Sequence, residues 1–152
     1  MNGRTGQTTL IFPGLAGFYD KVQPIAYTLV RVIIGYIIFM HGWGKVTGAG
    51  LAGISAYMTK HGLEPGALFA FLAILLETVG AICIILGLFT RFFAAALAIE
   101  MAIAFLAVHA SHGFSASKGG FEYVLLLGVV LFAIAIRGAG PYSVDAKIGK
   151  EL

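Results

Sequence analysis

Four long apolar stretches dominate this chain, and each carries an ionisable residue that a lipid environment disfavours. Arg31 lies in the first stretch, Glu77 and Glu100 lie near the middle of the second and third, and Glu122 opens the fourth. A charged side chain at the centre of a bilayer costs at least ~2.5–3.5 kcal/mol on insertion scales, so such residues usually face the bundle interior and find partners there. These four positions therefore constrain both how the helices pack and where a polar site can lie.

The composition is that of a membrane protein. Of the 152 residues, 59% are hydrophobic and 11% are charged, whereas soluble domains are about 25% charged. A membrane-spanning helix needs about 20 apolar residues. We therefore predict an all-α fold, a polytopic transmembrane four-helix bundle that forms a single domain over residues 1–152. The expected spans are about 24–43, 65–88, 91–110 and 121–136.

The segments between the spans have their own patterns. Residues 1–9 are polar and are expected to be disordered, and no secretory h-region precedes the first span, so we expect no cleaved signal. Residues 10–21 mix aromatic residues and glycine with a late charge pair, which is typical of a short interfacial segment. Residues 44–64 are expected to hold a second interfacial helix, whose apolar face contains Leu51, Ile54, Tyr57 and Met58. Residues 111–120 form a polar, glycine-rich loop.

The positive residues predict the orientation in the membrane. Six lie on the side of the two termini and the 87–91 turn, and three lie on the other side, with Arg31 set aside as intramembrane. The larger group is Arg4, Lys21, Arg91, Arg137, Lys147 and Lys150, and the smaller is Lys45, Lys60 and Lys118. Positive loops stay inside, so both termini are expected in the cytoplasm. The net charge of +3 is too small and too scattered to indicate nucleic-acid binding.

Three of the buried charges are predicted to meet in one layer. From helical rise, Arg31 lies about 10 Å, Glu77 about 16 Å and Glu100 about 14 Å from the cytoplasmic ends of their helices. Each shares a helical face with glycine or alanine, which allow close helix packing. The arginine and the two acids are therefore expected to face one another, and these three residues are the candidate catalytic group.

One arginine cannot neutralise two carboxylates in a medium of low dielectric constant. Either Lys45 or a histidine reaches in, or one of Glu77 and Glu100 keeps its proton at neutral pH. Two interpretations follow for this cluster. It is an ion-pair latch that fixes helix register, or it is a mid-membrane site for a proton, a quinone headgroup or a small polar substrate. The second is favoured because intramembrane ionisable residues are functional candidates by default.

A second group of polar residues collects at the outer ends of the helices. All four histidines, His41, His61, His109 and His112, are predicted on this side, together with Trp43, Lys45 and Glu122. We add His41, Lys45, His109 and Glu122 to the three buried charges as candidate ligand-binding residues. The spacing is a weak match to a metal site, so hydrogen bonding, proton exchange or headgroup contact is expected instead. Cys83 is a lone cysteine, which excludes an intrachain disulfide.

Several short motifs, in order, carry a family resemblance. Arg31 and Gly35 precede His-Gly-Trp-Gly-Lys at 41–45. Glu-Thr-Val-Gly at 77–80 precedes Gly-Leu-Phe-Thr-Arg at 87–91. Met101, Ala104, His109 and Glu122 follow, and the chain closes with Gly-Ala-Gly-Pro-Tyr-Ser-Val-Asp at 138–145. From about residue 25 to residue 145, the chain resembles the DoxX/DoxD family of small four-helix inner-membrane proteins. The family takes its name from a relative of the membrane subunit of a thiosulfate:quinone oxidoreductase.

The resemblance implies a redox-associated protein of the bacterial inner membrane. Arg31, Glu77 and Glu100 would border a quinone or proton site, and the outer histidines would face a periplasmic partner. The sequence has no cysteine pair, haem motif or flavin fingerprint, so a separate subunit or a bound quinone must supply the electron-transfer chemistry. The leading prediction is a membrane subunit or accessory protein of a redox system, and whether it is itself an enzyme stays open. The alternatives are a small proton-coupled transporter acting as an oligomer, and a non-catalytic scaffold or assembly factor.

Overall fold

The structure is a computed structural model that describes residues 10–151. These residues form helices joined by turns and loops, without a strand, which confirms the predicted all-α membrane fold. The expectations for residues 1–9 lie outside the described part of the chain.

The first half of the chain forms a long helix, a short one and the start of a third. A 3₁₀ turn, Pro13–Leu15, leads into α1 (Ala16–Thr47), which is followed by α2 (Gly50–Lys60). After a short connection come α3 (Gly66–Leu75), a π-helical segment (Leu76–Gly80), here called the first π turn, and α4 (Ala81–Leu86). These last three elements form one continuous helix.

The second half forms a helical hairpin and a short tail. α5 (Thr90–Ala104) continues into the second π turn (Phe105–His109). Two 3₁₀ turns, Ala110–His112 and Ala116–Lys118, lie in the loop before α6 (Glu122–Arg137). The tail contains α7 (Val144–Ile148).

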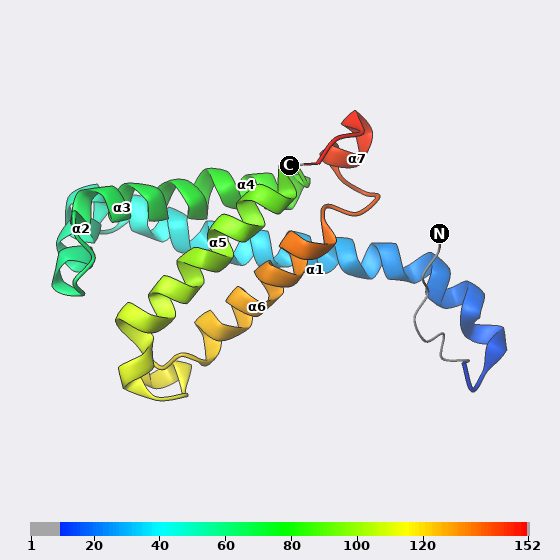
Figure 1. The fold of residues 1–152 in the computed structure, drawn as a ribbon, viewed down its shortest axis with the longest axis horizontal. Coiled ribbons are helices and arrows are strands. Elements are labelled where there is room, and N and C mark those ends of the chain that lie inside the picture. The colour runs from blue at the N-terminus through cyan, green and yellow to red at the C-terminus, as the bar shows by residue number, and fades with distance from the viewer. Residues whose placement is uncertain (1–9, 152) are drawn as a thin grey trace.

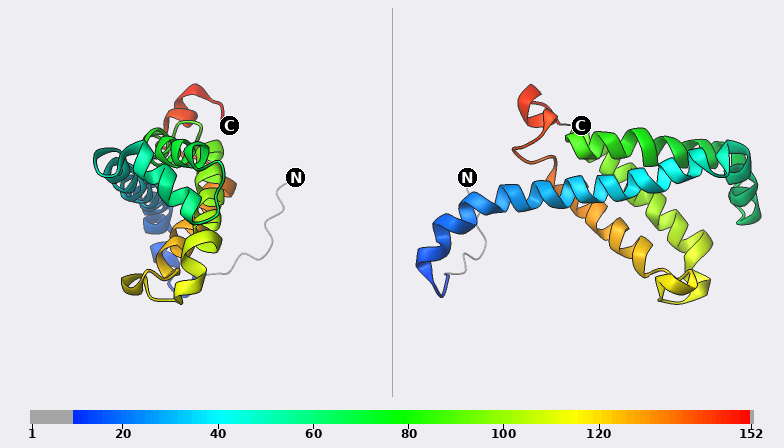
Figure 2. Two further views of the ribbon diagram at one scale, coloured as in Figure 1. Left: turned by 90° about the vertical axis from the view of Figure 1, so that its left-hand side faces the viewer. Right: turned by 180° about the vertical axis from the view of Figure 1, so that it is seen from behind.

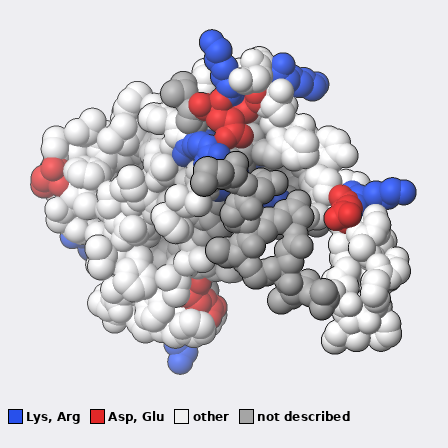
Figure 3. All heavy atoms as spheres, turned by 45° about the vertical axis from the view of Figure 1, so that its right-hand side comes forward, with Lys and Arg blue, Asp and Glu red and all other residues white. Residues whose placement is uncertain are grey.

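Three helical stretches are long and apolar enough to cross a membrane: Pro13–Thr47, Gly66–Leu86 and Thr90–His112. With α6, which is the shortest of the four as expected, they form the predicted membrane bundle. Figure 3 shows a wide surface without charged side chains, with small groups of charges at its edges, as contact with lipid requires.

The structure differs from the predicted interfacial segments in one respect. Residues 10–21 do not form a separate helix, because α1 begins at Ala16 and continues through Pro24. A proline inside a membrane helix is tolerated where other groups satisfy the backbone, and one turn after Pro24 the Thr28 hydroxyl donates to the Pro24 carbonyl. Figure 2 shows this N-terminal part of α1 projecting beyond the other helices. The expected helix between the first two spans is present as α2.

The bundle consists of two helix pairs that diverge (Figure 1). α1 runs beside α3 and α4 in one pair, and α5 packs against α6 in the other. The pairs share a core that includes Ile38, Ile84, Leu97, Leu131 and Ile134. They meet near the turn between α4 and α5 and separate towards the second π turn. We call the first region the closed end (residues 27–31, 87–91 and 138–151) and the second the open end (residues 41–63 and 103–123).

A glycine allows the close contact in the first pair. A Cβ atom on Gly42 would lie 2.6 Å from the main-chain carbonyl of Glu77, so no larger residue fits there without a shift. This contact sets the two antiparallel helices in register, with Gly42 at the level of Glu77. It therefore decides which charged residues can meet.

Candidate functional site

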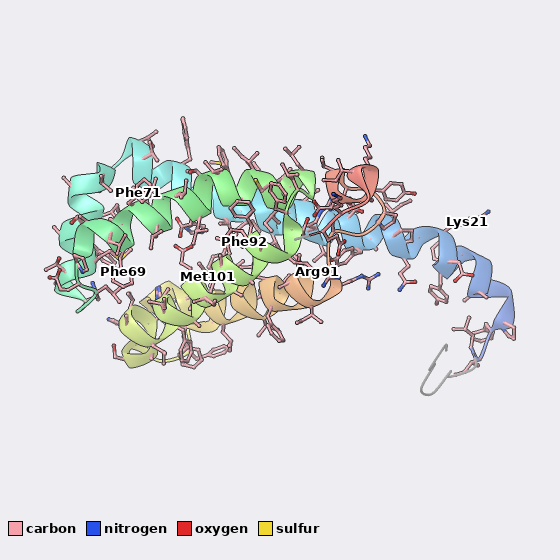
Figure 4. The ribbon with its side chains drawn as sticks, turned by 45° about the horizontal axis from the view of Figure 1, so that its top comes forward. Lys21, Phe69, Phe71, Arg91, Phe92 and Met101 are labelled. Atoms are coloured by element: carbon pink, nitrogen blue, oxygen red, sulfur yellow. The ribbon has the colours of Figure 1, made fainter. Side chains whose placement is uncertain are left out.

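A cavity of about 690 Å³ lies in the open half of the bundle. α1, α2, α3, α5, α6 and both π turns contribute to its lining, which is mostly apolar. Phe69 of α3 and Met101 of α5, both lining residues, are labelled on its two sides in Figure 4. Small-molecule sites usually enclose about 300–1,000 Å³ with apolar walls and a few polar groups, so the cavity has the size and character of a ligand site.

Five of the predicted site residues line this cavity: His41, Lys45, Glu77, Glu100 and His109. Lys45 Nζ forms an ion pair with Glu77 Oε2. The Glu77 side chain is 6% exposed and that of Lys45 is 26% exposed, so the pair joins the buried part of the cavity to its rim. The pairing follows from the helix register, because Lys45 lies one turn beyond Gly42 on α1.

Glu100 brings a second carboxyl group beside Glu77. Its Oε2 atom is buried and has no hydrogen-bond partner among the described residues. Buried polar atoms in proteins nearly always have a partner, and an exception calls for an explanation. The positive charge of Lys45 is paired with Glu77. The carboxyl group of Glu100 is therefore available to bind a ligand or to hold a proton.

Each π turn carries one titratable residue of the cavity, Glu77 in the first and His109 in the second. In the first, the Thr78 hydroxyl donates to the carbonyl of Ile74, one turn earlier. Single π-helical turns inside α-helices are rare and often occur at functional sites. The two turns therefore mark the same region as the unpartnered carboxyl does.

The rim of the cavity is built by the histidines nearest to it. His109 Nδ1 lies 2.7 Å from the carbonyl oxygen of Gly119, which ties the second π turn to the following loop. The His41 ring lies 5.8 Å from the ring of Tyr123 on α6. Tyr57 of α2 and Tyr123 also line the cavity, and sequence analysis did not single them out for the site.

The remaining polar residues that were predicted at this end of the helices, His61, His112 and Glu122, make local contacts and do not line the cavity. His61 Nδ1 and His112 Nδ1 each lie 2.8 Å from the carbonyl oxygen of a residue one turn earlier, Tyr57 and Val108. Glu122 stands in the first turn of α6 and does not line the cavity. A carboxylate at a helix N-terminus is favourable for the helix itself. The predicted ligand-binding role of Glu122 has no support in this geometry.

The structure corrects the predicted place of Arg31. Its guanidinium group donates hydrogen bonds to the carbonyl oxygens of Ala139, at 2.6 Å, and Tyr142, at 2.7 Å, at the closed end. Arg31 precedes Gly42 by three turns of helix, about 16 Å of helical rise, and Gly42 marks the level of Glu77. The prediction that Arg31 joins the two acids is wrong, and Lys45 takes that place.

The error has a simple cause. The depth estimate took the start of the first helix, at Pro24, as level with the 87–91 turn, whereas α1 begins at Ala16 and its first part projects beyond the other helices. The start of α1 is not level with that turn, and Arg31, well inside the helix, is. Arg31 therefore lies beside the turn between α4 and α5, where the Arg31 side chain fills the space that a Cβ atom on Gly87 would need. Its buried charge has a structural use, which is to hold the tail.

Other polar contacts at the closed end also hold the tail. Asp145, which is 1% exposed, accepts hydrogen bonds from the backbone amides of Phe89 and Thr90 and from the Thr90 hydroxyl. This carboxylate thus caps the N-terminus of α5 from a distant part of the chain. Arg91, labelled in Figure 4, forms an ion pair with Glu151 in the same region.

The fold and the cavity together define a small helical membrane protein with a polar group of side chains inside an otherwise apolar pocket. The DoxX family model matches residues 26–110, more than half of the chain, and the chain belongs to that family.

Relatives in three organisms align over most of their length. An uncharacterized protein of Haemophilus influenzae is 32% identical over 136 residues, 87% of this chain and 97% of the relative. The inner membrane protein YqjF of Escherichia coli is 30% identical over 134 residues, 86% of this chain and 98% of the relative. The "Putative oxidoreductase CatD" of Bacillus subtilis is 29% identical over 131 residues, 86% of this chain and 92% of the relative. No solved structure matches the chain.

Proposed function

We propose that this protein binds a quinone headgroup in the cavity at the open end and handles a proton there. It acts as the membrane subunit or accessory protein of a redox system in the bacterial inner membrane. The proposal depends mainly on one observation, the buried and unpartnered Glu100 Oε2 beside the Lys45–Glu77 ion pair. The printed names of two relatives, "Inner membrane protein YqjF" and "Putative oxidoreductase CatD", agree with it.

The residues of the cavity fit a quinone in chemical type. A quinone headgroup is a flat, largely apolar ring with carbonyl oxygens that accept hydrogen bonds. The apolar walls suit the ring, and Lys45 and a protonated Glu100 are donors for the carbonyl oxygens. Few polar groups in an apolar pocket is the usual pattern of such sites, because the polar groups fix orientation and the walls supply affinity.

Two roles fall to the residues of this chain. Lys45 and Glu77 position the headgroup, and Glu100 holds the proton that a carbonyl oxygen takes up on reduction. A bound quinone would supply the two-electron chemistry: its reduction to the hydroquinone takes two electrons from a partner protein and two protons, one from Glu100 and one from water that reaches the cavity. His41, at the level of Glu77, and His109, in the second π turn, both line the cavity, and a histidine can exchange a proton with water near neutral pH.

The test is equilibrium binding of a short-chain benzoquinone to the purified protein in lipid nanodiscs. We expect saturable binding that Glu100→Leu weakens about tenfold, because leucine has no hydrogen-bond donor for a quinone carbonyl oxygen. Glu122→Leu is the matched control, since Glu122 is a glutamate near the open end that does not line the cavity. Absence of binding to the wild-type protein, or equal affinity in the two variants, would contradict the proposal.

A further inference from the structure

We infer that the cavity opens sideways into the bilayer between α3 and α5, and that the ligand carries a long apolar tail which leaves the protein through this opening. The inference rests on the proposed function and deepens it. It adds the route of the ligand and the part of the ligand that lies outside the polar site. We call the opening between α3 and α5 the lateral opening, and Leu72 and Ile99 border it.

The exposure of the lining residues locates the opening. Leu72 on α3 and Ile99 on α5 both line the cavity, yet they are 40% and 62% exposed on the apolar outer surface of the bundle. A side chain that belongs to both the cavity wall and the lipid-facing surface stands at an edge between them. On both helices this edge faces the hydrocarbon region, since α3 and α5 lie within the stretches that can span a membrane.

The other walls are closed or polar. Between α5 and α6 the lining residues Met101 and Val124 are 6% and 9% exposed, so this wall separates the cavity from lipid. Towards the loops, the lining includes Tyr57 and His109, whose polar groups suit water. The side between α3 and α5 is therefore the one through which an apolar chain can leave without contact with water.

The divergence of the helix pairs explains why the opening exists. α5 packs against α4 and the first π turn near the closed end and then separates from α3 towards the open end, as Figures 1 and 4 show. The alanine residues Ala96 and Ala104 of α5 line the cavity and are only partly buried. Short side chains at these positions leave room where a helix contact would otherwise close the gap.

The cavity is polar at one place and apolar elsewhere, which selects an amphiphile. Glu77 and Glu100 are close to Leu72 and Ile99 in sequence, so a headgroup at the acids places its tail at the opening. Each methylene group of the tail is more stable in lipid than in water. A ligand with a long isoprenoid tail therefore stays in the bilayer while its headgroup occupies the site.

Two benzoquinones test this inference, one with a single-isoprene tail and one with a long polyisoprenoid tail. Leu72→Trp and Ile99→Trp fill the lateral opening at lipid-facing positions, where a large apolar residue is tolerated. We expect each variant to weaken binding of the long-tailed quinone about tenfold and to change binding of the short one less than about twofold. Leu75→Trp is the control, because Leu75 is an exposed residue of α3 that does not line the cavity, and both quinones should bind it normally.

A second measurement uses the wild-type protein, so it does not depend on the folding of a variant. A long-tailed quinone with a photoreactive group in its first isoprene unit should cross-link to α3 and α5 around Leu72 and Ile99. Cross-links confined to α2 or α6, or equal effects of the tryptophan variants on both quinones, would overturn the lateral opening while leaving headgroup binding intact. Failure of both quinones to bind the wild-type protein would overturn the proposed function and this inference together.

Discussion

The two ends of this bundle use buried charge in opposite ways. At the closed end, Arg31 and Asp145 direct their charges at main-chain groups of the tail and of the α4–α5 turn. At the open end, Lys45 and Glu77 pair with each other, and Glu100 lines the cavity with an Oε2 atom that has no hydrogen-bond partner among the described residues. The comparison teaches that a charged residue in an apolar helix is not by itself a sign of chemistry. Arg31 Nε is also buried without a partner among the described residues, so a missing hydrogen bond does not by itself distinguish the two ends. What distinguishes them is that Glu100 lines a cavity, whereas the guanidinium of Arg31 lies against the main chain of the tail.

The strongest test of the structural role of the closed end is Asp145→Ala. Two backbone amides and one hydroxyl would lose their acceptor, and an unsatisfied buried donor costs about 1–3 kcal/mol, so the free energy of unfolding should fall by about 3–5 kcal/mol. Thermal unfolding in detergent measures the loss. Asp20→Ala, at an exposed position near the start of α1, should change stability by less than about 0.5 kcal/mol. Equal effects of the two substitutions would show that the cap on α5 is unimportant.

A test that sharpens the comparison is Arg31→Met. The carbonyl groups of Ala139 and Tyr142 would lose their donors, which should cost about 2–3 kcal/mol of stability. The quinone affinity of the folded protein should stay within about twofold of the wild type, because the arginine is remote from the cavity. Loss of binding in a folded variant would return Arg31 to the functional site and break the distinction between the two ends.

A smaller change in stability is expected for Gly42→Ala, and Gly44→Ala on the same helix is its control. A methyl group at Gly42 would overlap the backbone of Glu77, and overpacking costs about 1–3 kcal/mol, so Gly42→Ala should be destabilising. Gly44 has no atom within 4 Å of the corresponding position. Gly44→Ala should therefore be neutral or stabilising by up to about 1 kcal/mol, because alanine favours the helix. A higher melting temperature for Gly42→Ala than for Gly44→Ala would contradict the close packing of α1 on the first π turn.

The smallest expected effect concerns the stability of the open end. Glu100→Gln should change the free energy of unfolding by less than about 1 kcal/mol, because an amide is no harder to bury than an unpartnered carboxyl. Glu77→Gln removes the partner of Lys45, whose side chain can still reach water, so the cost should be about 1 kcal/mol. Chemical unfolding of both variants in parallel measures the difference. A large loss in Glu100→Gln would mean that this carboxyl is a structural group, as the charges at the closed end are.

Much of the fold could be predicted from local patterns in the sequence. Long apolar stretches fix the helices, since a membrane leaves few other structures for them. The inward direction of Glu77 also followed from its neighbours, because Ala70, Ala73, Gly80 and Ala81 share its helical face and all are buried. Lys45 could be considered as a partner for the acids because it ends the same helix face as Gly42.

The errors concern register, which local patterns do not contain. The place of Arg31 depends on which residue of α4 lies beside it, and this is set by the contact between Gly42 and Glu77, far along the chain. The role of Asp145 depends on an α5 terminus more than fifty residues earlier, and nothing in the sequence around Asp145 identifies that partner. The π turns were not predicted from the sequence. Each is a five-residue segment inside a longer helix, and its amino-acid composition does not differ from that of the α-helix around it. The helices could thus be found one at a time, but their alignment required the assembled structure.

The cap that Asp145 places on α5 has a consequence for synthesis of the chain. Asp145 leaves the ribosome only after α1, α3–α4, α5 and α6 have been translated, so α5 enters the membrane with its first amides still waiting for an acceptor. Completion of the closed end is then one of the last steps of assembly, and a nascent chain interrupted before Asp145 would contain all four long helices in an unfinished bundle. A reporter of folding fused after the tail should therefore give a signal only when the closed end, and with it the whole bundle, has assembled.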